Sequence, residues 1–247
     1  MDIKLILYYF FIAAGALFSA VTGYRLGVKR GFLPRTLKLY ISVAIFSGIF
    51  SALLMGQLQN FIMSLTGLEF YPSRLRIFGA LLFNPVLIYF PVKQLAGDYD
   101  EVLDIFSAGT YGMSGISKIG CAVYGCCYGT ACTPGVYTPF EEHSVFPVQL
   151  LEAVLSLIIC FCVFYAVSKK KHRKGAVYPL SLILYGVMRF FVEFLRYYSE
   201  EELNAFYGLS FWQWVSIITV LIGAVWLTYK LHRKSRGLQK SERQCEE

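Results

Sequence analysis

Long apolar stretches alternate with short polar connections along almost the whole chain. A helix needs roughly 20 residues to cross the hydrocarbon core of a bilayer, and the stretches are about that long. The second and the last are the clearest, because no charge occurs from Leu39 to Leu68 or from Leu203 to Tyr229. We predict seven spanning helices, over residues 4–23, 39–63, 76–95, 102–124, 147–167, 176–197 and 208–229.

The basic residues predict how these helices are oriented. They gather in the connections 24–38 and 168–175 and at the start of the tail, and such tracts face the cytoplasm. Between the first two tracts the chain must cross an even number of times. The span 102–124 is therefore retained, although it contains Asp104 and Lys118, as a helix that its neighbours shield from lipid. The predicted fold is all-α and polytopic, with about seven transmembrane helices, the N-terminus outside and the C-terminus cytoplasmic.

Composition excludes an ordinary soluble domain. Of the 247 residues 56% are hydrophobic and only 16% are charged, against roughly 25% charged in soluble domains. The net charge of +7 lies in tracts that flank apolar runs, so we expect no nucleic-acid partner. We expect one transmembrane domain over residues 1–230, a basic cytoplasmic tail over 231–247, and a multi-pass location in the cell (plasma) membrane.

Five ionisable residues converge on the outer half of the membrane when the spans are placed: Lys118, Glu152, Arg189, Glu193 and Arg196. The last three are spaced i, i+4, i+7 and are predicted to share one helix face. Charges at this depth are costly unless they are paired or functional. Structural ion pairs are one interpretation. The excess of cations favours a pocket for an anionic headgroup, because arginine binds phosphate through two hydrogen bonds.

Three segments resemble the bacterial prolipoprotein diacylglyceryl transferase family. The most specific is YGVMRFFVEFLR at 185–196, which is similar to the family's signature of Tyr-Gly, Arg, Phe-x-x-Glu and Arg. FPVQLLEA at 146–153 resembles Pro-x-Gln-Leu-Tyr-Glu, with Leu151 in place of tyrosine. SKIGCAVYGCCYG at 117–129 resembles a third, glycine-rich signature in position and glycine pattern.

The resemblance implies an enzyme of lipoprotein biosynthesis, whose active site faces the outer leaflet. Such an enzyme takes phosphatidylglycerol, or a related anionic phospholipid, and moves its diacylglyceryl group to a cysteine thiol of a lipobox-bearing precursor. A thioether forms and glycerol-1-phosphate leaves. No metal and no other cofactor is expected. The reaction needs cations that stabilise the leaving phosphate and a thiolate as the nucleophile.

The resemblance also implies roles for individual residues. The expected catalytic residues are Arg189 and Lys118, which clamp the phosphate, and Glu193, which orients the arginines. Arg196 is expected to recruit the headgroup. The residues expected to line the substrate pocket are Gln149, Glu152, Cys121, Cys126 and Cys127.

The chain departs from the family pattern at several polar positions. Phe78 stands where the family has a histidine that is proposed to help activate the thiol. Lys118 replaces the arginine of the glycine-rich signature. Cys121 and Tyr124 replace its asparagines, and Cys126 replaces its glutamate. These departures leave open the alternative that the chain is a divergent relative that uses another thiol acceptor.

Four cysteines, Cys121, Cys126, Cys127 and Cys132, lie within twelve residues and admit several interpretations. They could line the transferase pocket, where one thiol acts as acceptor, relay or base. They could serve a membrane thiol–disulfide oxidoreductase, which is our alternative function, or form structural disulfides. A metal site is disfavoured, because adjacent cysteines chelate poorly. A non-catalytic lipid-binding scaffold is the third hypothesis.

Overall fold

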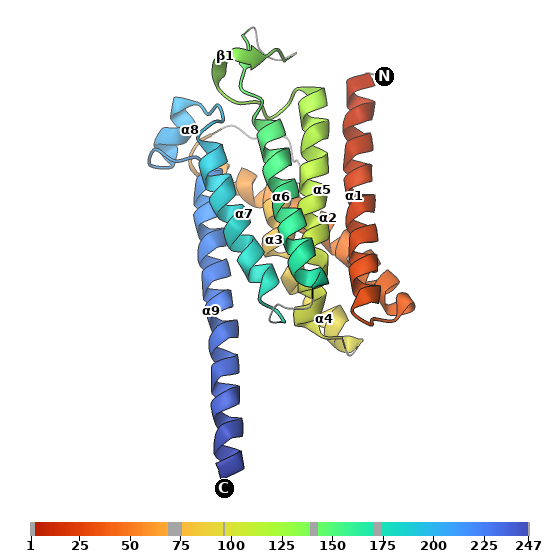
Figure 1. Cartoon of the computed structure of the whole chain (residues 1–247). Coiled ribbons are helices and arrows are strands. Elements are labelled where there is room, and N and C mark those ends of the chain that lie inside the picture. The colour runs from red at the N-terminus through yellow and green to blue at the C-terminus, as the bar shows by residue number, and fades with distance from the viewer. Residues whose placement is uncertain (1–2, 69–75, 96, 139–142, 170–173, 247) are drawn as a thin grey trace.

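The computed structural model describes residues 3–68, 76–95, 97–138, 143–169 and 174–246, with side chains described up to His232. The described chain is mostly helical and carries a short strand at one end (Figure 1). The elements in order are α1 (Ile3–Lys29), α2 (Pro34–Leu65), α3 (Ile77–Leu82), α4 (Asn84–Gln94), α5 (Tyr99–Tyr124), β1 (Ala131–Val136), α6 (Val148–Ser168), α7 (Val177–Glu193), α8 (Glu200–Ala205) and α9 (Phe211–Glu246).

Five helical segments are long and apolar enough to cross a membrane. Their outer faces carry large apolar side chains that stay exposed, including Phe46, Phe90 and Phe161. A soluble protein would bury such surface, whereas lipid covers it. The chain is therefore a multi-pass membrane protein of the all-α class, as predicted. The five segments are Ile3–Lys29, Pro34–Leu65, Ile77–Gln94, Val148–Ser168 and Phe211–His232.

The polar helix α5 lies inside the bundle, packed against α1 on one side and α6 on the other (Figure 1). Glycines allow this close packing. A Cβ on Gly115 would lie 3.0 Å from the carbonyl oxygen of Ala153 in α6, which is how small residues let membrane helices approach. The helix predicted over 102–124, shielded by its neighbours, is confirmed as α5.

One predicted span is interrupted, and another ends earlier than predicted. The stretch 76–95 is broken at Phe83, because Pro85 lies in the first turn of α4 and cannot donate a backbone hydrogen bond to the preceding turn. The stretch 176–197 is helical only to Glu193. The chain beyond α7 leaves the helix to pair with the loop after α5, where Arg196 forms an antiparallel bridge with Gly129. The prediction that Arg196 shares a helix face with Arg189 was therefore wrong.

The last helix is longer than predicted. α9 continues from Phe211 to Glu246, so the expected domain boundary at residue 230 falls inside it. Figure 1 shows α9 extending beyond the end of the bundle that lies opposite the N-terminus and β1. The division into a transmembrane domain and a tail stays a prediction.

Ion pairs tie the basic connections together at the end of the bundle from which α9 extends. Lys174 lies 2.9 Å from Glu101, and Lys230 lies 2.5 Å from Asp100. Arg30 donates to the carbonyl of Val167 at 2.7 Å.

Asp104 of α5 caps α7. Its carboxylate accepts backbone hydrogen bonds from Gly175 at 2.7 Å and Tyr178 at 2.8 Å. A carboxylate at a helix N-terminus satisfies otherwise unpaired N–H groups and favours the helix dipole. Asp104 thus fixes the start of the helix that carries Arg189 and Glu193.

Candidate functional site

Three helix ends meet close to β1 (Figure 1). Five charged side chains come together there. Lys118 lies in the last turns of α5, and Glu152 lies in the second turn of α6. Arg189 and Glu193 occupy the last turns of α7, and Arg196 follows directly. The structure thus brings together all five residues that the sequence placed in the outer half of the membrane.

Glu152 lies at the centre of this network. Its Oε2 lies 2.5 Å from the Lys118 ammonium and 2.6 Å from the Arg196 guanidinium. Its Oε1 is ion-paired with Arg189. The carboxylate is almost fully buried, so each cation compensates a charge that could not be buried alone. The sequence pattern predicted Glu152 as a pocket-lining residue but not as the shared anion of three cations.

Glu193 is the second anion of the network. Its Oε2 lies 2.5 Å from Arg189, and its Oε1 lies 3.5 Å from the Nε of Arg196. The hydroxyl of Tyr198 donates a hydrogen bond to Oε1. Glu193 therefore forms ion pairs with both arginines, and its orienting role in catalysis stays a prediction. Tyr198 was missed by the sequence reasoning, because an aromatic residue beyond the signature carries no pattern of its own.

The network is short of acceptors. Three cations face two carboxylates, which leaves a net positive charge. The Nε of Arg189 is buried without a hydrogen-bond partner among the residues that the structure describes. A buried donor of this kind favours an anionic ligand. Lys118 and Arg196, with 19% and 13% of their side chains exposed, are more accessible than Arg189 at 7%.

An aromatic group lies beneath Arg189. Its guanidinium carbon lies 5.9 Å from the ring centroid of Phe78, and Phe78 stacks on Trp212 with a centroid distance of 5.7 Å. A cation over an aromatic face is stabilised without a hydrogen bond. Phe78 therefore packs against the arginine from α3 and offers no titratable group.

The clustered cysteines adjoin the network. The sulfurs of Cys121, Cys126 and Cys127 lie within 4.8 Å of one another, and all three residues are half-buried free thiols. Hydrogen bonds from Cys121 and Cys126, with Lys118 close by, hold the pKa of the Cys127 thiol well below its usual range. A thiolate in this position is the nucleophilic form of cysteine.

Gln149 supports the cysteine loop. Its buried side-chain amide donates a hydrogen bond of 2.7 Å to the carbonyl of Cys126. Gln149 and the three clustered cysteines therefore belong to one structural unit at the edge of the ion-pair network. Their expected contact with a substrate stays a prediction.

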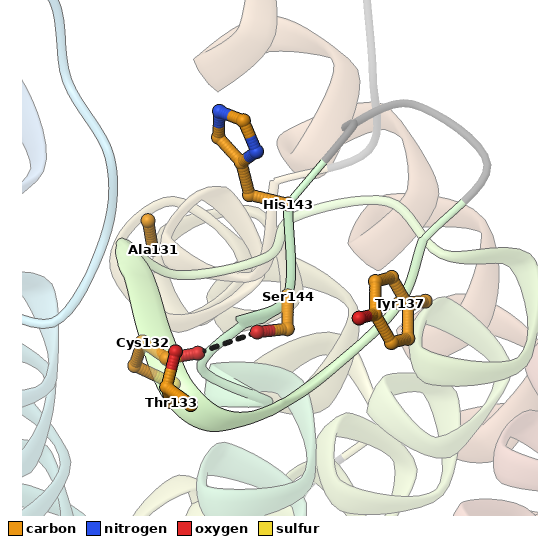
Figure 2. Close-up of a pocket in the computed structure, with 6 residues that line it drawn as sticks. All are labelled: Ala131, Cys132, Thr133, Tyr137, His143 and Ser144. Atoms are coloured by element: carbon orange, nitrogen blue, oxygen red, sulfur yellow. Dashed lines mark hydrogen bonds between the residues drawn. The ribbon is translucent and has the colours of Figure 1, made fainter.

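Cys132 lies apart, in an open pocket of about 550 Å³ in the segment that contains β1 (Figure 2). The hydroxyl of Ser144 donates to the Cys132 carbonyl at 2.7 Å, and the ring of His143 points away from that contact. No member of the ion-pair network lines this pocket. His143 is thus not part of the network among the described residues.

Residues 1–229 match the sequence model of one family, described as prolipoprotein diacylglyceryl transferase. The chain belongs to this family. The phosphatidylglycerol–prolipoprotein diacylglyceryl transferase of Clostridium tetani is 29% identical over 190 residues, which cover 71% of this chain and 75% of that protein. The protein named phosphatidylglycerol–prolipoprotein diacylglyceryl transferase 2 in Clostridium perfringens is 25% identical over 243 residues, which cover 94% of this chain and 92% of that protein.

Membership of the diacylglyceryl transferase family confirms what the three motifs predicted. A shorter match, to the enzyme of Burkholderia ambifaria, is 39% identical over 99 residues and covers 40% of this chain. The relatives give no support to the thiol–disulfide oxidoreductase alternative. The matches do not test the roles of single residues. Those roles rest on the geometry of the ion pairs and stay predictions.

Proposed function

We propose that this chain transfers the diacylglyceryl group of phosphatidylglycerol to the cysteine thiol of a lipobox-bearing precursor. The observation that carries the proposal is the buried, net-positive network of Lys118, Arg189 and Arg196 around two carboxylates. Family membership and the names of the relatives support the same reaction.

The network supplies what the reaction needs at the phosphate. As the thiolate attacks the glyceryl carbon, the bond from that carbon to the phosphate oxygen breaks and negative charge grows on the leaving glycerol phosphate. Arg189 and Lys118 stabilise that charge, and Arg189 has one donor to spare in its Nε. Glu193 holds Arg189 and Arg196 in place, so little reorganisation is needed when the charge develops.

Lys118 and Arg196, the more exposed cations, contact the lipid headgroup first. Arg196 and Lys118 share one oxygen of Glu152, so an incoming phosphate exchanges for that carboxylate oxygen. The headgroup then moves toward Arg189, which lies deeper over Phe78. Gln149, Cys121, Cys126 and Cys127 form the wall on the acceptor side.

The proposed topology has seven spans, with α5 and α7 crossing the membrane beside the five apolar segments. The basic connections then face the cytoplasm, and the network faces the outer leaflet of the plasma membrane. Cysteine-accessibility mapping tests this arrangement in intact cells. In a background whose seven native cysteines are replaced by serine, a cysteine introduced at Thr138 should react with a membrane-impermeant maleimide, and one introduced at Arg35 should not; the opposite pattern would reject the orientation.

Activity in cells tests the function itself. The chain, expressed in a bacterial strain depleted of its own transferase, should restore lipidation of a lipobox reporter, read from the mass of its N-terminal peptide. Arg189→Ala should abolish restoration and Arg189→Lys should weaken it, because lysine lacks the planar fork. Arg35→Ala, at an exposed position outside the network, is the matched control and should restore fully. Restoration by Arg189→Ala at equal expression would reject the assigned role.

A further inference from the structure

The turn after α5 folds two adjacent cysteines back onto a third. Gly125 takes a left-handed conformation with φ +89°, which ends the helix. The backbone N–H groups of Gly125 and Cys126 both donate to the carbonyl of Cys121, at 2.9 and 3.2 Å. This compact turn, fixed from α6 by Gln149, holds three sulfurs within 4.8 Å of one another.

Cys127 adopts a backbone conformation that non-glycine residues avoid. Its φ is +62°, in the left-handed region that is unfavourable for an L-residue because its Cβ comes too close to the following carbonyl oxygen. Side chains of neighbouring residues in an extended chain point to opposite sides. The left-handed turn instead directs the Cys126 and Cys127 sulfurs to one point, which removes the usual objection to chelation by adjacent cysteines. Strain that concentrates chemical groups in this way is typical of functional sites.

The spacing suits a thiophilic metal ion. Zinc–sulfur bonds of about 2.3 Å in a tetrahedron set sulfurs about 3.8 Å apart, so the three side chains need only small rotations. Three thiolates around a divalent ion carry one net negative charge. Arg196 and Lys118 both lie close enough to Cys127 for their positive charges to act on its sulfur. These cations stabilise an anionic metal–thiolate group.

We propose that Cys121, Cys126 and Cys127 bind one Zn²⁺ ion, or a similar thiophilic divalent cation, and leave its fourth position open. Three protein ligands with an open position are the pattern of catalytic rather than structural zinc. The position adjoins Lys118, so it lies beside the phosphate-binding network. This assignment goes against the expectation of a metal-free enzyme that the family resemblance implied.

The open position can bind the lipobox thiol, and this role of the metal site rests on the proposed function. A thiol that coordinates a metal cation loses its proton, here to solvent. The bound thiolate of the lipobox cysteine attacks the glyceryl carbon and forms the carbon–sulfur bond. The carbon–oxygen bond to phosphate breaks, and its electron pair leaves on glycerol phosphate beside Arg189 and Lys118. No electrons are exchanged with any further reactant.

Metal binding is tested first on the purified protein in detergent, by elemental analysis and by Cd²⁺ titration followed through thiolate-to-metal charge-transfer absorption. Wild type and Cys132→Ser should each bind one ion per chain. Cys127→Gly should lose this uptake. That variant removes one sulfur and also the strain of the positive φ, so it should unfold no earlier than wild type. Uptake should weaken on acidification, since the bound thiols must lose protons.

The transfer reaction then separates the metal site from the enzyme. Stripping with a chelator should abolish lipidation of a lipobox peptide, and Zn²⁺ should restore it in wild type and Cys132→Ser but not in Cys127→Gly. No saturable uptake by wild type, or a disulfide within the cluster in place of uptake, would overturn the proposal even if transfer proceeds. Full activity after stripping would overturn the thiol-activating role and leave the transferase standing. Metal uptake without any lipid transfer would support the site and reject the proposed function.

Discussion

At the scale of single residues, Glu152 holds the site together. It is the one carboxylate among the described residues that contacts all three cations of the network. The i, i+4 spacing of Arg189 and Glu193 could be read from the sequence as an ion pair, and the structure confirms it. The contacts of Glu152 join segments far apart in the chain, and helical periodicity within one segment carries no information about them.

Removing the charge of Glu152 should therefore be costly. Glu152→Gln leaves one buried and two half-buried cations with one carboxylate, and breaking a buried pair costs roughly 3–5 kcal/mol. The free energy of unfolding in mixed micelles, followed by circular dichroism, measures this loss. Lys174→Gln is the control, because it breaks exposed pairs with Asp98 and Glu101 that contribute at most about 1 kcal/mol. Equal, small losses for both variants would contradict the central position of Glu152.

Glu202 in α8 should make stability depend on pH. Burial, with a contribution from the charge of Glu193, raises the pKa of Glu202 to about 6, although Arg76 opposes the shift. The folded state thus favours the protonated acid, and this stabilisation is complete below the ordinary pKa and is lost as pH rises through 6. Glu202→Gln should raise the free energy of unfolding at pH 7.5 by about 1–2 kcal/mol.

The same variant should give no gain at pH 4.5, where the buried acid is already protonated. Thermal unfolding at the two pH values measures the difference. Glu200→Gln in the same short helix is the matched control, because Glu200 is exposed. A gain of equal size at both pH values would show that the effect does not come from the ionisation of Glu202.

At the scale of elements, α7 is the helix whose position matters most. It starts at the cap that Asp104 provides and ends at the network. Its length was overestimated from sequence because the apolar pattern continues past Glu193, whereas the pairing of Arg196 with Gly129 is a tertiary contact. A helix over 102–124 was predicted from the charges of the flanking tracts, and its shielding by neighbouring helices was predicted because it contains polar residues such as Asp104 and Lys118.

The packing of α7 on α9 gives a test at this scale. A Cβ on Gly186 would lie 2.8 Å from Val220 and 3.0 Å from the carbonyl oxygen of Ser216. Gly186→Ala should therefore overpack the interface and cost about 1–3 kcal/mol, and it should lower transfer because Arg189 lies one turn further on. Gly48→Ala is the matched control, since its Cβ would meet only Asn84 at 3.6 Å.

Gly48→Ala should be neutral or stabilise by up to about 1 kcal/mol, because alanine favours a helix more than glycine does. Unfolding in mixed micelles compares the two variants directly. If Gly186→Ala were as stable as Gly48→Ala, the close contact between α7 and α9 would not be required for the fold.

At the scale of the whole molecule, charge is divided between the two ends of the bundle. One end pairs the basic connections with Asp98, Asp100 and Glu101. The other end gathers the net-positive network and the three-thiol cluster. The sequence predicted this division, because loop charges and span depth are both encoded locally. It did not predict that three sulfurs meet at one point, which depends on the left-handed backbone of Cys127.

The most direct measurement of the central claim is transfer by the purified protein. Wild type, incubated with labelled phosphatidylglycerol and a lipobox peptide, should release glycerol phosphate and give a peptide heavier by one diacylglyceryl group, both read by mass spectrometry. Arg35→Ala should match it, and Arg189→Ala should lose at least about 100-fold in rate, as removal of one charge-stabilising donor typically does. No peptide modification under conditions that support the Clostridium perfringens relative, or an undiminished rate in Arg189→Ala, would contradict the account.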